Sequence, residues 1–315
     1  MSDLFTFGEA LAVFISSDTD SVITAKKFER VTAGAEANVA VAISRLGLKS
    51  RFFTKVGNDE IGQTILNDIA GEGVDVKDCT TANSFSGSMV RNPGTTNKVE
   101  VTYLRKGSAA SLISAVDIKP EFITGSRWVH TTGITCAISE SAANAVQTAQ
   151  QIARDKNVLQ SFDLNLRRKI WSESAAAKKL FPLAQNLDLL IGGEDEYQVV
   201  FNESDPEKAL QIANDRGCNI AVMTKGDQPL RFSINGEVKV LLPPKVKAVD
   251  PVGSGDAFTG GTIAALLAGK SALDALTQGS YCGARVASKF GDWTGIPTGK
   301  NGIMNDQIKA EMNSL

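Results

Sequence analysis

The sequence predicts an α/β protein with a doubly wound, mostly parallel sheet and a small accessory β-sheet that forms a lid. Short strand-like runs alternate with helix-length segments along most of the 315 residues, and this alternation is typical of a parallel sheet covered by helices. Two regions, about 11–31 and 84–105, break the alternation with β-type residues and turns. They predict either the lid or a pair of surface hairpins.

The alternation predicts individual elements along the chain. In the first half we expect strands at 4–7 and 51–56, and helices at 36–46 and 61–70 that end at Gly47 and Gly71, because glycine commonly follows the last helical turn. Further on we expect an amphipathic helix at 141–154 and strands at 128–131, 158–162, 187–191 and 220–224. No repeat or Pro/Ser-rich linker marks a second domain, so a single domain over residues 1–315 is predicted.

Composition and charge exclude several classes of protein. The 33 Lys and Arg residues nearly balance the 35 Asp and Glu residues, so no general field gathers nucleic acid or an anionic membrane. The first ten residues lack the basic start and apolar run of a signal peptide, and no segment approaches about eighteen uninterrupted apolar residues. We therefore expect a cytoplasmic protein whose partners are small molecules.

The cysteine and histidine residues do not predict a metal site or a disulfide framework. Cys79, Cys136, Cys218 and Cys282 are far apart, without a C-x-x-C pair, so reduced structural thiols are expected. The one histidine, His130, lies in a run that predicts a strand end. A histidine there is expected in a wall or core, which also argues against a Ser-His-Asp hydrolase.

The strongest chemical signal is the segment Asp250-Pro251-Val252-Gly253-Ser254-Gly255-Asp256, which leads directly into an apolar helix. The two glycines allow the backbone to approach a ligand closely, and the amides of the first helical turn carry partial positive charge. Such a helix start suits a phosphoryl group that gains negative charge during transfer. Beside it, the Asp256 carboxylate can accept a proton from an attacking hydroxyl. The alternative is that Asp256 only caps the helix.

Two other glycine patterns are not phosphate motifs. Gly253 begins a G-x-G-x-x-G pattern whose last position is Phe258, so the dinucleotide fingerprint fails. Gly269-Lys270-Ser271 is similar to the end of a P-loop, but Ala264 occupies the first glycine position. Gly269 is expected to end the preceding helix.

A second cluster again places a glycine before a helix. Gly34 could bring backbone amides onto a substrate, and Asn38, one turn later, could hydrogen-bond a hydroxyl with both its donor and its acceptor. The alternative is close helix packing through small residues. Asp163, Asn165 and Arg167 follow one strand at alternating positions, so they could face one cleft at its end; the alternative is that each is a solvated loop residue. Tyr103 and Arg105 alternate in the same way on the lid strand.

Together these motifs resemble the PfkB-type, ribokinase-like carbohydrate kinases, and within them most closely the 2-keto-3-deoxygluconate kinases. The family's two signatures are similar to 250–258 and to 34–47 with 56–59. The subfamily resemblance rests on Gly8-Glu9-Ala10, 103–110, 133–134, 163–167 and Gly291-Asp292. The resemblance extends over nearly the whole chain.

The resemblance implies a ribokinase-like fold and roles for the matching residues. Asp256 would be the base, with Gly253, Ser254 and Gly255 as the anion hole. The substrate pocket would be lined by Gly34, Asn38, Tyr103, Arg105, Arg167 and Asp292. ATP would lie against Asn165, Thr224, Lys225, Gly226, Gly253, Gly255, Ala284, Ala287 and Ser288. Mg²⁺ would be held through the ATP phosphates and water near Glu196, and a monovalent cation is a further candidate cofactor.

Three positions depart from the family pattern. Gly193 replaces the asparagine of N-x-x-E before Glu196, Pro229 replaces the second glycine of the nucleotide loop after Gly226, and Met89 replaces a tyrosine of the substrate pocket. These changes affect the expected metal water shell, the ATP loop and the substrate assignment, and none of them affects Asp256.

We therefore predict an ATP-dependent kinase for the primary hydroxyl of 2-keto-3-deoxygluconate, associated through the exposed lid face into a dimer or larger homo-oligomer. Arg105 and Arg167 favour a sugar acid because a guanidinium binds a carboxylate through two parallel hydrogen bonds. The alternatives are the same reaction on fructose or ribose, and a catalytically silent sugar sensor on this fold.

Overall fold

The computed structural model describes residues 1–94, 99–307 and 310, and it divides into two compact units. The first unit contains Met1–Phe5 and Ile113–Pro243, and the second contains Thr6–Leu112 and the chain from Pro244 onward. Strand β1 (Ser2–Phe7) therefore contributes to both. Within the described residues, no helix combines the length and the apolar character that a membrane span requires.

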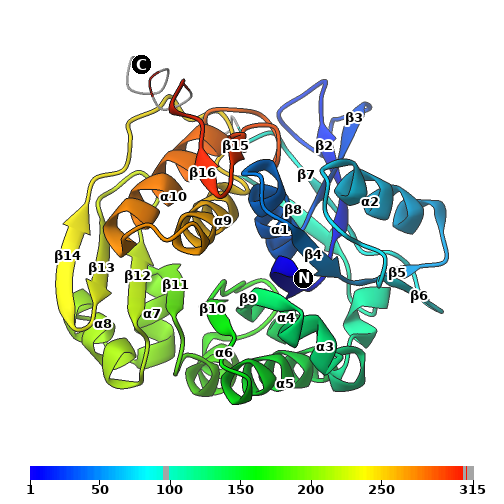
Figure 1. The fold of residues 1–315 in the computed structure, drawn as a ribbon. Helices are drawn as coiled ribbons and strands as arrows, with labels where there is room; N and C mark the ends of the chain where they lie inside the picture. The colour runs from blue at the N-terminus through cyan, green and yellow to red at the C-terminus, as the bar shows by residue number, and fades with distance from the viewer. Residues whose placement is uncertain (95–98, 308–309, 311–315) are drawn as a thin grey trace. The chain divides into compact units, whose positions relative to one another are not determined.

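A mostly parallel sheet is the centre of the first unit (Figure 1), with the strand order β14-β13-β12-β11-β10-β9-β1. Strands β9 to β12 are parallel, and β13 and β14 continue the sheet antiparallel. Their bounds are β9 (Ser126–Thr132), β10 (Leu159–Asp163), β11 (Leu189–Gly193), β12 (Ile220–Thr224), β13 (Leu230–Ile234) and β14 (Glu237–Leu241). The four strands that the sequence predicts in this part of the chain are confirmed.

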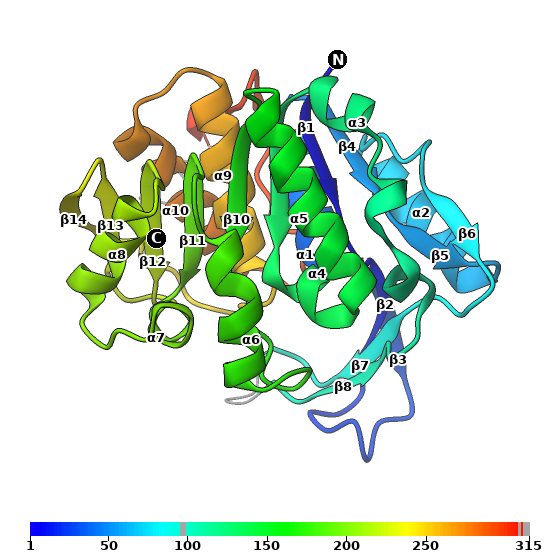
Figure 2. The ribbon, with the colours of Figure 1, turned by 90° about the horizontal axis from the view of Figure 1, so that it is seen from below.

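Helices cover the strands of this first unit (Figure 2). They are η2 (Ala115–Asp117), α3 (Pro120–Thr124), α4 (Gly133–Ile138), α5 (Glu140–Asp155), α6 (Glu173–Leu180), η3 (Phe181–Leu183), α7 (Glu194–Phe201) and α8 (Pro206–Asp215). Helix α5 begins after Ser139, whose side chain accepts a hydrogen bond from the Ala142 amide, and it packs on β9 and β10. This helix confirms the amphipathic segment expected at 141–154.

A separate four-stranded sheet in the second unit has the order β3-β2-β7-β8. Its strands are β2 (Leu11–Ser16), β3 (Phe28–Ala33), β7 (Ser88–Arg91) and β8 (Val101–Leu104). Strand β2 pairs antiparallel with β3 and parallel with β7, which joins both predicted β regions in one sheet. One face holds a buried apolar cluster of Leu11, Val13, Ile15, Ala33 and Met89. Its roles as a lid and as an interface between subunits stay predictions.

The rest of the second unit consists of helices and short strands. They are α1 (Ala35–Arg45), β4 (Ser50–Phe53), β5 (Lys55–Gly57), α2 (Glu60–Gly71), β6 (Thr80–Ala82), η1 (Ala109–Leu112), α9 (Ser254–Leu267), α10 (Ala272–Ala287), β15 (Gly299–Lys300) and β16 (Ile303–Met304). Helix α9 packs against α1 and α10. Glycines allow the close approach: an added Cβ would lie 2.5 Å from the Ala42 Cβ at Gly260, and 2.6 Å from the Cys282 Sγ at Gly261.

One predicted boundary in the second unit is wrong. The strand expected at 51–56 is interrupted at Thr54, because the chain leaves β4 and pairs in β5 with β6 instead. The helix expected at 61–70 with its end at Gly71 spans Glu60–Gly71, so its end is confirmed. Gly73, with a φ of 81°, adopts the left-handed conformation just beyond it. Gly47 and Gly269, with φ of 80° and 78°, adopt this conformation as expected.

Candidate active site

Asp256 lies in the first turn of α9, directly after the predicted glycine turn. Gly253 precedes the helix with a φ of 81°, a conformation that favours glycine. A Cβ added at Gly253 would also lie 3.0 Å from the Asp292 carbonyl oxygen. At Gly255, by contrast, an added Cβ would meet no atom within 4 Å. The first turn of α9 is therefore tightly held at Gly253 and open to a ligand at Gly255.

The Asn38 side chain connects Asp256 with Asp292. Its Nδ2 lies 2.6 Å from Asp256 Oδ2 and 3.4 Å from Asp292 Oδ2, and its Oδ1 accepts a hydrogen bond from the Trp293 indole. Because an indole N–H can only donate, the Asn38 oxygen faces Trp293 and its nitrogen faces the two carboxylates. Asn38 thus holds the Asp256 carboxylate in a defined position.

Asp292 is a buried carboxylate beside this network. Burial raises its pKa to about 6; the Arg91 charge and the Asn38 hydrogen bond lower the pKa, and the Asp250 charge raises it. Its Oδ1 accepts no hydrogen bond from the part of the chain that the structure describes. This oxygen is buried and lies 3.8 Å from the Arg91 Nη2. The predicted contact of Asp292 with the substrate stays a prediction.

Asp250 fixes the chain that enters the glycine turn. Its Oδ2 lies 2.6 Å from the Arg91 Nη2, and its Oδ1 accepts a hydrogen bond from the Val252 amide at 3.2 Å. Arg91, at the end of β7, is completely buried. Sequence reasoning missed Arg91 and Trp293, because neither belongs to a motif. The only available signal for Arg91 was an arginine that directly follows the apolar pair Met89-Val90.

The residues predicted to contact ATP on α10 lie against the same turn. The Ala287 carbonyl accepts hydrogen bonds from the Val249 amide at 2.7 Å and the Asp250 amide at 3.1 Å. A Cβ added at Gly283 would lie 2.9 Å from the Ser254 carbonyl oxygen. The C-terminal part of α10, with Ala284 and Ala287 and followed by Ser288, therefore packs beside the start of α9.

Gly34 precedes α1 and packs against the chain that follows β1. A Cβ added there would lie 2.5 Å from the Glu9 carbonyl oxygen. The contact supports the alternative that this glycine serves close packing. A substrate contact at Gly34 stays a prediction.

Arg105 forms an ion pair with the buried Glu9. Its Nη2 lies 2.5 Å and its Nε 2.6 Å from Glu9 Oε2, and the Ser108 hydroxyl donates to the other carboxylate oxygen. The Arg105 guanidinium also lies 5.3 Å from the centre of the Tyr103 ring. Tyr103 of β8 lies opposite Met89 of β7. Met89, which replaces a tyrosine of the family pattern, therefore lies next to Tyr103.

A second group of predicted residues gathers at the strand ends of the first unit. The register of β11 and β12 places Gly193 opposite Thr224. Glu196 accepts hydrogen bonds from the Gly193 amide at 2.7 Å and the Leu166 amide at 2.6 Å, and burial raises its pKa. Both oxygens of Glu196 thus accept backbone bonds. Its role in holding the metal water shell stays a prediction.

The other predicted residues of this group have different surroundings. Asn165 is buried and donates to Asp163 Oδ2 at 3.3 Å, whereas Arg167 is exposed. Strand β10 ends at Asp163, and Asn165 has a φ of 36°. The expectation that the three polar residues continue the alternation of the strand is therefore wrong. Lys225 forms an ion pair of 2.9 Å with Glu194.

The predicted site residues thus form two groups, one in each unit. The first unit holds Asn165, Arg167, Glu196, Thr224, Lys225 and Gly226. The second unit holds Gly34, Asn38, Tyr103, Arg105, Gly253, Ser254, Gly255, Asp256, Ala284, Ala287, Ser288 and Asp292. Within the second unit, the structure joins Asn38, Asp256 and Asp292 in one hydrogen-bonded network.

Comparison with known families decides the class of protein. The model of the pfkB family of carbohydrate kinases matches residues 1–299. The chain belongs to this family. The 2-dehydro-3-deoxygluconokinase of Bacillus subtilis (strain 168) is 30% identical over 300 residues, which are 94% of this chain and 93% of that protein. The probable fructokinase-5 of Arabidopsis thaliana is also 30% identical, over 94% of each chain.

Solved structures of pfkB-type and related kinases confirm the predicted ribokinase-like fold class. The 2-dehydro-3-deoxygluconokinase of Thermotoga maritima has a TM-score of 0.90 at 23% identity, over 99% of this chain and 100% of that chain. A double mutant of the Vibrio cholerae O395 fructokinase, with fructose, ADP and potassium ion bound, has a TM-score of 0.85 at 25% identity, over 98% of each chain.

Proposed function

We propose that this pfkB-family kinase transfers the γ-phosphate of ATP to the primary hydroxyl of 2-keto-3-deoxygluconate, with Asp256 as the general base. The observation that carries the proposal is the position of the Asp256 carboxylate in the first turn of α9, directly after the left-handed Gly253. A proton acceptor and the outward-facing amides of a helix start therefore occur together.

Phosphoryl transfer needs positioning and charge neutralisation more than covalent chemistry. Asp256 would take the proton of the primary hydroxyl while its oxygen forms a bond to the γ-phosphorus and the bond to ADP breaks. The amides of Gly253, Gly255 and Asp256 would stabilise the charge on the transferred group, whereas the Ser254 amide donates to the Pro251 carbonyl oxygen at 3.2 Å. The hydrogen bond from Asn38 would keep the Asp256 carboxylate aimed at the hydroxyl.

The residues present fit a magnesium ion held mainly by ATP and water. Among the described residues, no three His, Cys, Asp or Glu side chains gather into a metal site, and Mg²⁺ in kinases typically retains waters and binds phosphate oxygens. Bound Mg²⁺ would neutralise phosphate charge. The potassium ion in the related fructokinase supports a monovalent cation as a further candidate.

A sugar acid is the substrate that the residues favour. Arg105 is almost buried, with 11% of its side chain exposed, and its ion pair with Glu9 holds the guanidinium in a fixed orientation. A fixed guanidinium can bind a carboxylate through two hydrogen bonds. The relative from Bacillus subtilis supports this assignment, and the plant fructokinase at the same identity keeps fructose as the alternative.

The proposal is tested by ATP turnover with 2-keto-3-deoxygluconate, fructose and ribose, and by the variant Asp256→Asn. This variant should lower kcat by roughly 10²–10⁴-fold, the usual loss for a general base, while the fold and ATP affinity remain. Asp274→Asn is the matched control, because Asp274 holds the same position in the first turn of α10. Near-normal turnover of Asp256→Asn would leave Asp256 as a helix cap and refute the proposal.

A further inference from the structure

We propose that Arg91 is a positioning residue for phosphoryl transfer, because it holds Asp250 and Asp292, the two buried carboxylates beside the Asp256 turn. The inference rests on the proposed role of Asp256. Arg91 ends β7 of the accessory sheet, and Asp250 begins the glycine turn 159 residues later. Its action on the reaction would pass through these two carboxylates, without contact between Arg91 and the substrate.

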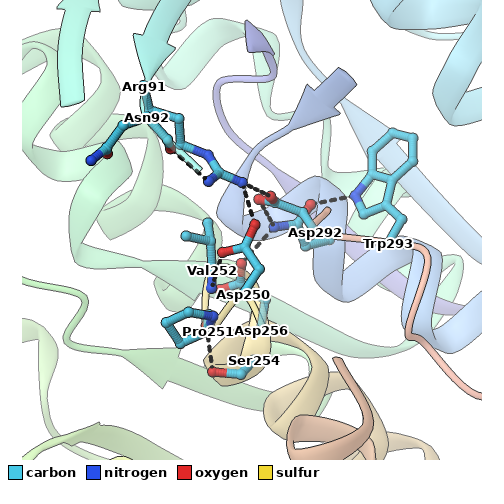
Figure 3. A network of polar contacts seen from close by, with 10 residues as sticks. Arg91, Asn92, Asp250, Pro251, Val252, Ser254, Asp256, Asp292 and Trp293 are labelled. Atoms are coloured by element: carbon cyan, nitrogen blue, oxygen red, sulfur yellow. Dashed lines mark hydrogen bonds and ion pairs between the residues drawn. The ribbon is translucent and has the colours of Figure 1, made fainter. Parts of the chain in front are cut away.

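The first support is the balance of buried charge (Figure 3). The side chains of Arg91, Asp250 and Asp292 are 0%, 1% and 3% exposed. Arg91 Nη2 lies 2.6 Å from Asp250 Oδ2 and 3.8 Å from Asp292 Oδ1. Buried charges cost free energy unless they are paired. Without the guanidinium, two buried carboxylates would face each other and would be expected to move apart or take up a proton.

The second support is the geometry of Asp250. Its two carboxylate oxygens are used by Arg91 and by the Val252 amide, so the bond from Arg91 fixes the chain that leads into Gly253. Gly253 in turn has no space on the side of Asp292, since an added Cβ would lie 3.1 Å from the Asp292 Cα. A displaced Asp250 would therefore shift the first turn of α9 and, with it, Asp256.

The third support is Gly94, which follows β7 and passes directly over Asp250. An added Cβ at Gly94 would lie 2.2 Å from Asp250 Oδ1 and 2.8 Å from Asp250 Cα. Two separate contacts, one from Arg91 and one from Gly94, thus join the β7 segment to Asp250. A single incidental ion pair would not require the second contact.

The charge of Arg91 also acts on Asp292. Three charged or polar side chains approach Asp292: Arg91 from β7, Asp250 from the glycine turn and Asn38 from α1. Asn38 also donates to Asp256. A second cation, Arg45 of α1, donates to the carbonyl oxygen of Trp293, the residue after Asp292. Arg91 is the cation that favours the ionised form of Asp292. Its loss should favour the protonated form, which gives up an acceptor for Asn38 and for a substrate hydroxyl.

The test compares Arg91→Gln and Arg91→Lys with the parent in kcat, in KM for ATP and in the pH dependence of kcat/KM. Arg91→Gln should lower kcat at least about tenfold, leave KM for ATP nearly unchanged, and move the acidic limb upward by about one pH unit. Arg91→Lys keeps the charge, so its acidic limb should stay in place. Arg30→Gln is the matched control. Arg30 lies on β3 of the same sheet and forms a 2.7 Å ion pair with Asp68.

An unchanged kcat and acidic limb in folded Arg91→Gln would overturn the inference. If Arg91→Gln does not fold, the variant Gly94→Ala decides, because its added methyl group displaces Asp250 while Arg91 remains. The kcat of Gly94→Ala should fall at least about tenfold, and the acidic limb of its pH profile should not shift. A parent-like kcat would overturn the inference. Asp256→Asn is measured in parallel. An inactive Asp256→Asn beside a normal Arg91→Gln refutes the inference alone, whereas an active Asp256→Asn refutes the proposed function.

Discussion

The charge of the substrate can be tested at Arg105, because this residue is a candidate to distinguish a sugar acid from a neutral sugar. A hydrogen bond to a charged partner contributes about 1.5–3 kcal/mol, or roughly 10–150-fold in binding. In the structure, Glu9 Oε2 already accepts bonds from the Arg105 Nε and Nη2. A substrate carboxylate must share the guanidinium with Glu9, so we expect the lower end of this range, about tenfold.

The assay measures kcat/KM for 2-keto-3-deoxygluconate and for fructose, in the parent and in Arg105→Ala. The parent should prefer the acid, and the variant should lose most of this preference, chiefly through a raised KM, because the carboxylate is remote from the reacting hydroxyl. Arg105→Ala also leaves the buried Glu9 without its ion-pair partner. The double variant Glu9→Gln/Arg105→Ala removes both charges, and it should show the same loss of preference with less loss of stability.

Two results would refute this reasoning. A parent that favours fructose would refute the sugar-acid assignment, and it would favour the alternative supported by the plant relative. An unchanged preference for the acid in Arg105→Ala would place the carboxylate elsewhere, with Arg167 as the remaining predicted arginine. Membership of the kinase family does not depend on either result.

Two further predictions concern stability. Gly253→Ala should lower the free energy of unfolding by at least about 1–2 kcal/mol, because a φ of 81° is unfavourable for alanine. Urea denaturation measures this loss, and the control Gly255→Ala should show little change. Equal losses of stability in the two variants would contradict the reasoning. Burial lowers the pKa of His130 to about 3, so the unfolded state binds the extra proton and stability should fall by up to about 1.4 kcal/mol per pH unit below about pH 6.5. His130→Gln should lack this part of the pH dependence in urea denaturation, and identical slopes would contradict it.

The sequence predicts the residues whose role follows from their own backbone conformation. Gly253 needs a left-handed φ, and Asp256 lies in the first turn of the helix that follows, so a local pattern identifies both. The strands β9 to β12 can be predicted from the sequence equally well, because each is a short apolar run between helices. The interruption at Thr54 is different. Its cause is the pairing of β5 with β6, which the residues around Thr54 do not specify.

Partners from distant segments explain what the sequence could not show. Arg91 and Arg30 both lie on strands of the accessory sheet and both form ion pairs, yet their side chains are 0% and 33% exposed. The residues beside each arginine give no reason for this difference. It arises because the chain that enters α9 brings Asp250 to Arg91, whereas Arg30 pairs with Asp68, whose side chain is 30% exposed. A motif can therefore identify Asp250 as part of the turn, but the cation that holds it is identified only when two segments 159 residues apart are seen in contact.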